Sequence, residues 1–165
     1  LNRQKPVWIE LGLQTIHPDS TRYIRRGYEL PIYEEAVQKL KAIGVSNLKK
    51  NHLDELTQFA KVKPAVNQIQ INLKEPNNEL LAVLKEEGIT PVAWGPMKAE
   101  DHQNEVLNEI GKAYNKTGAQ VLLKYQIERG VVVIPKSHNR ENQASNLDLF
   151  DFQLTAADVE KIESL

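Results

Sequence analysis

Short apolar runs alternate with amphipathic segments along this chain. Runs with strand-like composition occur at residues 7–16, 43–47, 64–71, 89–94 and 131–134. Helical spacing of apolar residues predicts helices at residues 21–26, 31–42, 48–60, 76–87, 105–114, 119–128, 140–147 and from Thr155 onward. Strands that alternate with helices need crossover connections, which favour a parallel sheet. The pattern predicts a single α/β domain, residues 1–165, with about five strands.

The β-branched run at residues 131–134 leads directly into Pro135, Lys136 and Ser137. Such a run can lie buried on both faces as a central strand. Pro135 cannot donate to a sheet ladder, so we expect the strand to end there. Ligands bind at the carboxyl ends of parallel strands, and Lys136 and Ser137 are therefore predicted to form one wall of a ligand site.

The amino-acid composition excludes several kinds of partner and metal site. The 165 residues suffice for one domain but fall short of the roughly 250 of a complete (β/α)8 barrel. The 21 basic and 22 acidic side chains give a net charge of -1, which indicates no nucleic-acid or membrane partner. The absence of cysteine excludes an iron–sulfur cluster or a sulfur-ligated zinc, and no metal site is predicted. No long apolar run or signal peptide is apparent, so we expect a cytoplasmic protein.

The second part of the chain contains six short sequence motifs whose order matches that of a known family. They are Ile-Gly-Val-Ser-Asn at 43–47, Lys-Pro-Ala-Val-Asn-Gln-Ile at 63–69, Val-Ala-Trp-Gly-Pro at 92–96, Lys-Thr-Gly-Ala-Gln-Val-Leu-Leu at 116–123, the stretch 129–137, and Phe-Asp-Phe-Gln-Leu-Thr at 150–155. Residues 43–165 resemble the C-terminal half of an aldo/keto reductase. That resemblance implies parallel (β/α) units from a TIM barrel, and a family that reduces aldehydes and ketones with NADPH.

The first part of the chain resembles something else. Residues 7–17, continued by residues 24–28, are similar to a strand and helix from the barrel of a radical SAM enzyme family. Residues 1–42 are therefore interpreted as a radical-SAM-like βα segment, and the chain as a designed or recombined chimera. A divergent, truncated natural reductase is the alternative. No radical SAM cluster is expected, because that chemistry needs three cysteines.

The reductase resemblance implies a cofactor site. Ser46, Asn47 and Gln68 match residues that hold the nicotinamide carboxamide, and Trp94 matches the aromatic residue that stacks on the ring. Without the resemblance, Ser46 and Asn47 are interpreted as a helix cap and Trp94 as core packing. Further matches face the phosphates or the adenine and are supplied by Lys136, Ser137 and Asn146.

Other positions depart from the reductase pattern. The arginine for the 2'-phosphate and the glutamate for the adenine are replaced by Asn142 and Ser145, which predicts weak NADP(H) binding. The tyrosine, aspartate and lysine of the reductase mechanism belong to the family's first half. Only His17 falls near the place of a catalytic histidine, and a polar residue at a strand-to-loop junction explains it equally well. No catalytic residue is therefore assigned.

About five strands cannot close an eight-stranded barrel, so open edges and an uncovered inner face are expected. The predicted fold is a partial barrel or an open flavodoxin-like sheet, with a homodimer through the open edges as a further solution. The expected function is a partial-barrel scaffold with vestigial NADP(H) binding and no independent catalysis. The alternatives are an NADPH-dependent oxidoreductase completed by dimerisation and a purely structural or interaction module.

Overall fold

A parallel sheet forms one half of the structure. The computed structural model describes residues 43–165, so the predicted strand 7–16, the predicted helices 21–26 and 31–42, and His17 lie outside the described residues. The strands are β1 (Ile43–Ser46), β2 (Pro64–Gln70), β3 (Thr90–Trp94) and β4 (Val132–Val133). They pair in parallel in the order β1-β2-β3-β4. The parallel α/β fold and the four predicted strands of this range are confirmed.

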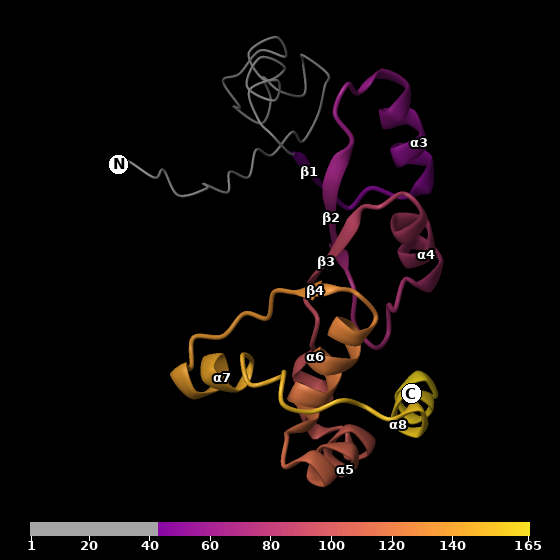
Figure 1. Ribbon diagram of the computed structural model, residues 1–165. Helices are drawn as coiled ribbons and strands as arrows, with labels where there is room; N and C mark the ends of the chain where they lie inside the picture. Colours follow the sequence, from indigo (N-terminus) through magenta and orange to yellow (C-terminus); the bar gives the residue numbers. More distant parts are fainter. Residues whose placement is uncertain (1–42) are drawn as a thin grey trace.

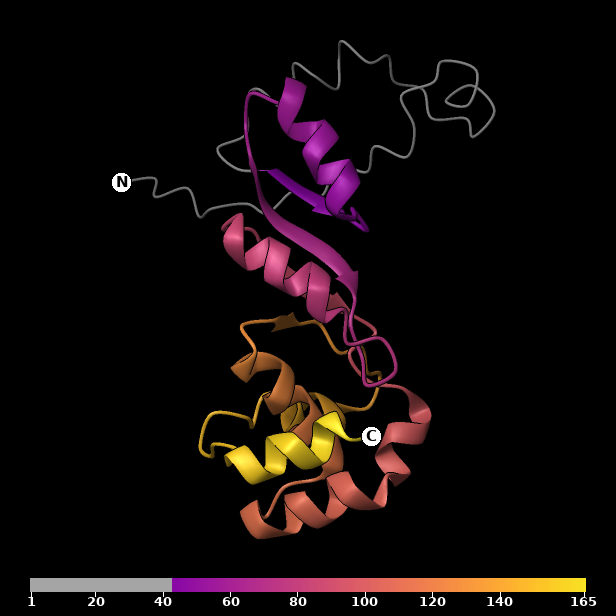
Figure 2. The same cartoon turned by 90° about the vertical axis from the view of Figure 1, so that its right-hand side faces the viewer.

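The order of the strands distinguishes the two predicted arrangements. A flavodoxin-like sheet places its second strand outside its first, whereas a barrel wall runs in sequential order. The four described strands are in sequential order. Helices α3 (Lys50–Phe59) and α4 (Asn78–Glu86) lie on the same side of the sheet, in front of the strands in Figure 2 (Figures 1 and 2). Residues 43–165 thus form part of a barrel wall.

The two faces of the sheet differ in burial. Alternate residues of a strand point to opposite faces. The face packed on the helices belongs to a core of Leu53, Ile69, Ile71, Leu84, Ile89, Ala93 and Val131. On the opposite face, Ser46, Gln68, Val92 and Val132 are paired across the sheet, and Val132 is 48% exposed. Among the described residues, this inner face has no covering layer.

The strand at residues 131–134 is not the central strand that its composition predicts. β4 contains only Val132 and Val133 and lies at the edge of the described sheet. Val131 is buried, but Val132 and Ile134 are 48% and 44% exposed. The prediction of burial on both faces is wrong because nothing among residues 43–165 packs against the inner face at this strand.

The other half of the structure is helical. It contains the 3-10 helix η1 (Ala99–Gln103), α5 (Glu105–Tyr114), α6 (Gly118–Glu128), α7 (Arg140–Ser145) and α8 (Ala156–Glu163). Local signals fix several boundaries: Thr117 and Thr155 cap α6 and α8 in capping boxes with Gln120 and Asp158. A second core joins α5, α6 and α8 through Leu107, Ile110, Val121, Leu122, Tyr125, Leu154 and Ile162. The helices predicted here are confirmed, with α7 ending at Ser145 instead of residue 147.

Candidate functional site

Four of the predicted site residues lie at the carboxyl ends of neighbouring strands. Ser46 is the last residue of β1 and Asn47 follows it, while Trp94 is the last residue of β3. Gln68 lies on β2, between them, and pairs with Ser46 in register. We call Ser46, Asn47, Gln68 and Trp94 the strand-end cluster.

Hydrogen bonds hold the strand-end cluster together. The Gln68 carbonyl accepts from Ser46 Oγ and from the Asn47 backbone N–H, both at 2.9 Å. Trp94 Nε1 donates to Asn47 Oδ1 at 3.0 Å, across the width of β2. Asn47 adopts a left-handed backbone conformation with φ 57°, which asparagine tolerates better than most residues. These four residues therefore lie close together, and their role as a cofactor site stays a prediction.

The simpler interpretations of the strand-end cluster do not fit. The N-cap residue of α3 is Lys49, so neither Ser46 nor Asn47 caps that helix. Trp94 is 37% exposed and is absent from both cores. A large aromatic side chain held by a hydrogen bond on an exposed sheet face can offer its ring to a planar ligand.

The remaining predicted site residues lie beyond β4: Lys136 and Ser137 in the segment that leaves the sheet and leads to α7, and Asn146 at the end of that helix (Figure 1). Lys136 is exposed. Ser137 Oγ accepts from the Asn139 backbone N–H at 3.1 Å, and the Ser137 carbonyl accepts from Gln143 Nε2 at 2.8 Å. Asn146 is the C-terminal cap residue of α7. Among residues 43–165, no hydrogen bond joins these three predicted residues to the strand-end cluster.

Two apolar residues on the inner face were not among the predicted site residues. Val132 pairs with Val92, and the Ile134 backbone N–H donates to the Ala93 carbonyl at 3.3 Å, which continues the contact of this segment with β3. By strand alternation, both side chains lie on the face that carries Trp94. The run 131–134 is uniformly β-branched, so the sequence could not show which of its alternating positions would be exposed.

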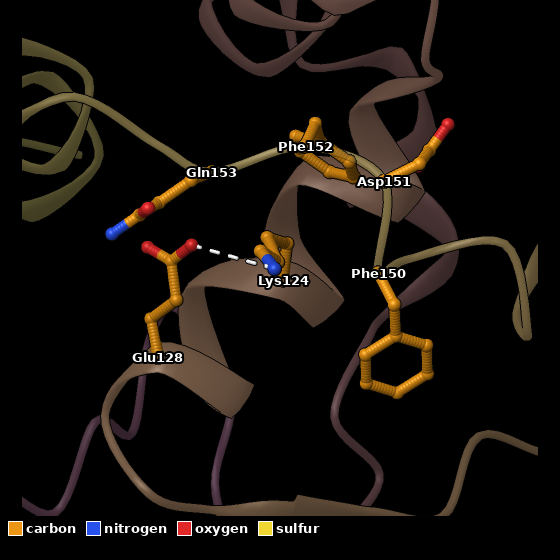
Figure 3. A pocket seen from close by; sticks show the side chains of 6 residues that line it. All are labelled: Lys124, Glu128, Phe150, Asp151, Phe152 and Gln153. Atoms are coloured by element: carbon orange, nitrogen blue, oxygen red, sulfur yellow. Dashed lines mark ion pairs between the residues drawn. The ribbon is translucent and has the colours of Figure 1, made fainter.

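An open hollow lies away from the strand-end cluster. It is lined by Lys124 and Glu128 of α6 and by Phe150, Asp151, Phe152 and Gln153 of the segment before α8 (Figure 3). Lys124 Nζ lies 3.6 Å from Glu128 Oε1 and 5.4 Å from the centre of the Phe152 ring. These contacts attach the C-terminal segment to α6, and no predicted site residue lines the hollow.

The two described tyrosines are engaged in the helical half. Tyr114 donates to Asp158 at 2.6 Å, and this hydrogen bond to a carboxylate raises the pKa of Tyr114. Burial raises the pKa of Tyr125, whose hydroxyl donates to Glu163 at 3.2 Å. Neither side chain has the depressed pKa that a catalytic proton donor of a reductase needs. The described residues also contain no cluster of His, Cys, Asp and Glu suited to a metal ion, and none of their helices has the length and apolarity of a membrane span.

Comparison with known sequences identifies relatives along most of the chain. Glyoxal reductase of Bacillus subtilis is 42% identical over 128 residues, which cover 77% of this chain and 46% of the relative. The 9,11-endoperoxide prostaglandin H2 reductase of Trypanosoma cruzi is 37% identical over 138 residues, covering 81% of this chain and 48% of that enzyme. The chain therefore spans about half the length of these relatives.

Solved structures give the same result. An aldo-keto reductase complexed with NADPH superposes with a TM-score of 0.74 at 33% identity, covering 80% of this chain and 45% of that one. A Bombyx mori aldo-keto reductase in complex with NADP gives a TM-score of 0.73 at 30% identity, covering 81% of this chain and 47% of that one. The partial-barrel architecture is thus that of reductase barrels.

The family model described as the aldo/keto reductase family matches residues 29–165. The match includes residues 29–42, so the predicted boundary at residue 43 between two family resemblances is wrong. The residues on which the second resemblance was based, 7–17 and 24–28, precede this match. Together with the fold and the strand-end cluster, the match shows that this chain belongs to the aldo/keto reductase family.

Proposed function

We propose that the strand-end cluster is a nicotinamide site, and that the chain binds NADP(H) through it without reducing carbonyl compounds on its own. One observation carries the proposal: Ser46, Asn47, Gln68 and Trp94 converge at adjacent strand ends on the uncovered face of the sheet. Relatives of similar fold were solved with NADPH or NADP at 33% and 30% identity, which supports this choice of ligand.

The chemistry of the cluster fits a nicotinamide ring. Trp94 has a partly exposed indole, and aromatic faces stack favourably on planar rings. Asn47 is exposed, and its Nδ2 donates to no atom of residues 43–165. A carboxamide has one carbonyl acceptor and one amino donor, so amide side chains at this place complement it. When bound, NADPH would supply the hydride for carbonyl reduction.

The phosphate and adenine groups of the cofactor would have fewer partners than the nicotinamide. In the segment 134–146, Lys136 is an exposed cation suited to a phosphate, and Ser137 and Asn146 supply polar groups. Asn142 and Ser145 replace the charged residues that the reductase resemblance implies, and α7 has no buried residue. We therefore propose weak binding with little preference for NADPH over NADH.

Tryptophan emission tests the binding proposal. The chain has two tryptophans, so a Trp8→Phe background leaves Trp94 as the reporter. Titration with NADPH should quench Trp94 and excite the reduced nicotinamide by energy transfer. Gln68→Leu should weaken the response several-fold, whereas Gln58→Leu on α3 should leave it unchanged. No response with cofactor in the millimolar range would refute nicotinamide binding.

Residues 43–165 hold no candidate for the reductase proton donor, since Tyr114 and Tyr125 bond to Asp158 and Glu163. We therefore expect no steady oxidation of NADPH by this chain with aldehydes. The interpretation of the chain as a recombined chimera now concerns residues 1–28, which precede the family match, and it stays a prediction.

A second candidate function is an active reductase completed by another polypeptide surface. Among the described strands, β1 and β4 each pair on one side only, and Val132 and Ile134 are exposed beside Trp94. Such edges and faces favour association, and a second copy of the chain would add strands at both edges. Light scattering during size-exclusion chromatography measures this. A dimer that oxidises NADPH with glyoxal, and loses this activity in Gln68→Leu, would establish the second candidate over the first.

A further inference from the structure

The hydrogen bond between Trp94 and Asn47 links two strands that are not neighbours. β2 separates β1 from β3 in the sheet, yet Trp94 Nε1 lies 3.0 Å from Asn47 Oδ1. The Asn47 backbone N–H is already held by the Gln68 carbonyl at 2.9 Å. Both the main chain and the side chain of Asn47 are therefore fixed by the protein.

The indole fixes more than the position of Asn47. An indole N–H is a donor only, so it must face the oxygen of the asparagine amide and never its nitrogen. With Oδ1 occupied, the exposed amide has two N–H groups at Nδ2, which donate to no atom of residues 43–165. The amide thus has two free donors at Nδ2 for a ligand at the strand ends, against one remaining lone pair on the Oδ1 that faces the indole.

We propose that Trp94 is a positioning residue that makes this site selective for a ligand carbonyl. The inference rests on the proposed nicotinamide site and adds the requirement that the ring substituent be a good hydrogen-bond acceptor. The substituent's own amino group is not needed at Asn47. A ring carrying an acetyl group should therefore keep the contact with Asn47, whereas a thioamide, whose sulfur is a poor acceptor, should weaken that contact and bind less well than the carboxamide.

Without the indole N–H, the Asn47 amide is free to rotate about its last side-chain bond. It would then present its oxygen or its nitrogen to the ligand, and the selection for a carbonyl would weaken. A neutral hydrogen bond of this kind corresponds to about a three- to tenfold change in affinity. Trp94→Phe tests this effect, because it removes the donor and keeps an aromatic ring; the smaller ring weakens stacking for every ligand, so the ratio between ligands reports on the donor.

The experiment compares three oxidised dinucleotides on the full chain: NADP+, its 3-acetylpyridine analogue and its thionicotinamide analogue. Isothermal calorimetry should give about three- to tenfold weaker binding of the thionicotinamide analogue than of NADP+, and any difference between NADP+ and the acetyl analogue measures the contacts of the carboxamide's amino group with Ser46 and Gln68. In Trp94→Phe the ratio between carbonyl and thiocarbonyl ligands should fall towards one. Asn47→Asp keeps an acceptor for the indole but replaces the donor, and it should lose the selectivity and weaken all three ligands.

A second measurement reports on the free protein. In a Trp8→Phe background the single indole N–H signal in a nitrogen-15 NMR spectrum belongs to Trp94. Its exchange with solvent should be slowed, and Asn47→Ala should accelerate it. An unchanged ligand ratio in Trp94→Phe, or an indole exchange rate indifferent to Asn47→Ala, overturns this inference while nicotinamide binding stands. Absence of binding by any dinucleotide overturns the proposed function and this inference together.

Discussion

Two polar clusters of this protein differ in how far their polar groups are already satisfied by the protein. The strand-end cluster gathers side chains from three strands on an exposed face, and Asn47 Nδ2 has no acceptor within residues 43–165. In the helical half, Lys116 Nζ donates to Asp148 and Asp151 at 2.7 and 2.8 Å, with its side chain only 6% exposed. We call these three residues the lysine tether.

The charged groups of the lysine tether pair with one another. The Lys116 ammonium meets two carboxylates and lies 5.6 Å from the centre of the Phe152 ring, while Gln120 Nε2 donates to the Asp148 carbonyl at 2.9 Å. Such satisfied groups stabilise the C-terminal segment and have little left for a ligand. The strand-end cluster is ordered by the protein and still has exposed donors. That contrast separates a candidate site from a structural cluster.

The largest expected effect tests whether the inner face is open. Leu122 is fully buried among α5, α6 and α8, so Leu122→Ala should lower the free energy of unfolding by about 2–5 kcal/mol. Val132 is 48% exposed on the inner face, and Val132→Ala should change it by less than about 0.5 kcal/mol. Urea denaturation measures both. A loss in Val132→Ala close to that of Leu122→Ala would mean that another part of the chain or a second copy covers the face.

Local sequence rules predicted the boundaries of helices better than they predicted which side chains would be buried. Gly88 and Gly130, with φ of 64° and 80°, end helices as the C-terminal glycine rule requires, and Thr117 caps α6. Each of these signals acts within a few residues. The exposure of Val132 and Ile134 depends instead on what packs against β4, which no local pattern records.

The strand-end cluster, unlike Lys136 and Ser137, was predictable only through the family resemblance. It named Asn47 and Trp94 but not the bond between them, which joins residues 47 positions apart. Lys116 and Asp151 are similarly separated by 35 positions, and neither was singled out. Contacts over such distances follow from how helices and strands stack, so residue type and spacing alone do not specify them.

A smaller effect compares close packing in the two halves. A Cβ at Gly111 on α5 would lie 2.3 Å from the Lys116 carbonyl oxygen, which is backbone and cannot rotate away. Gly111→Ala should therefore lower the free energy of unfolding by about 1–3 kcal/mol, despite the better helix propensity of alanine by about 1 kcal/mol.

Gly44 on β1 is the matched control for this comparison. A Cβ there would meet Val66 Cγ2 at 2.7 Å, a side-chain atom that can move on the open face. Gly44→Ala should cost less than Gly111→Ala in the same urea titration. The reverse ranking would show that the sheet, and not the α5–α6 contact, is the more tightly packed part of the described structure.

The smallest effect is the pH dependence of the lysine tether. The hydrogen bond from Lys116 holds the pKa of Asp151 below its usual 3.8. A carboxyl with a lowered folded pKa adds stability that is present above pH 3.8 and is lost as the pH falls through the folded value. Asp151→Asn should therefore lower the urea midpoint near neutral pH, and this difference from the unsubstituted chain should shrink in acid.

At alkaline pH the contribution of Lys116 to stability falls as the pH rises, opposite to the trend of Asp151 in acid. Hydrogen bonds to Asp148 and Asp151 raise the pKa of Lys116 above 10.5, so its contribution is present below that pH and is lost as the pH rises through the folded value. The control variant for Asp151→Asn is Asp54→Asn, which breaks the exposed ion pair of Lys50 and Asp54. It should change the urea midpoint little at any pH, because exposed ion pairs add little stability. If both variants behaved alike across the pH range, the tether would be no more than another surface ion pair, and the contrast with the strand-end cluster would rest on burial alone.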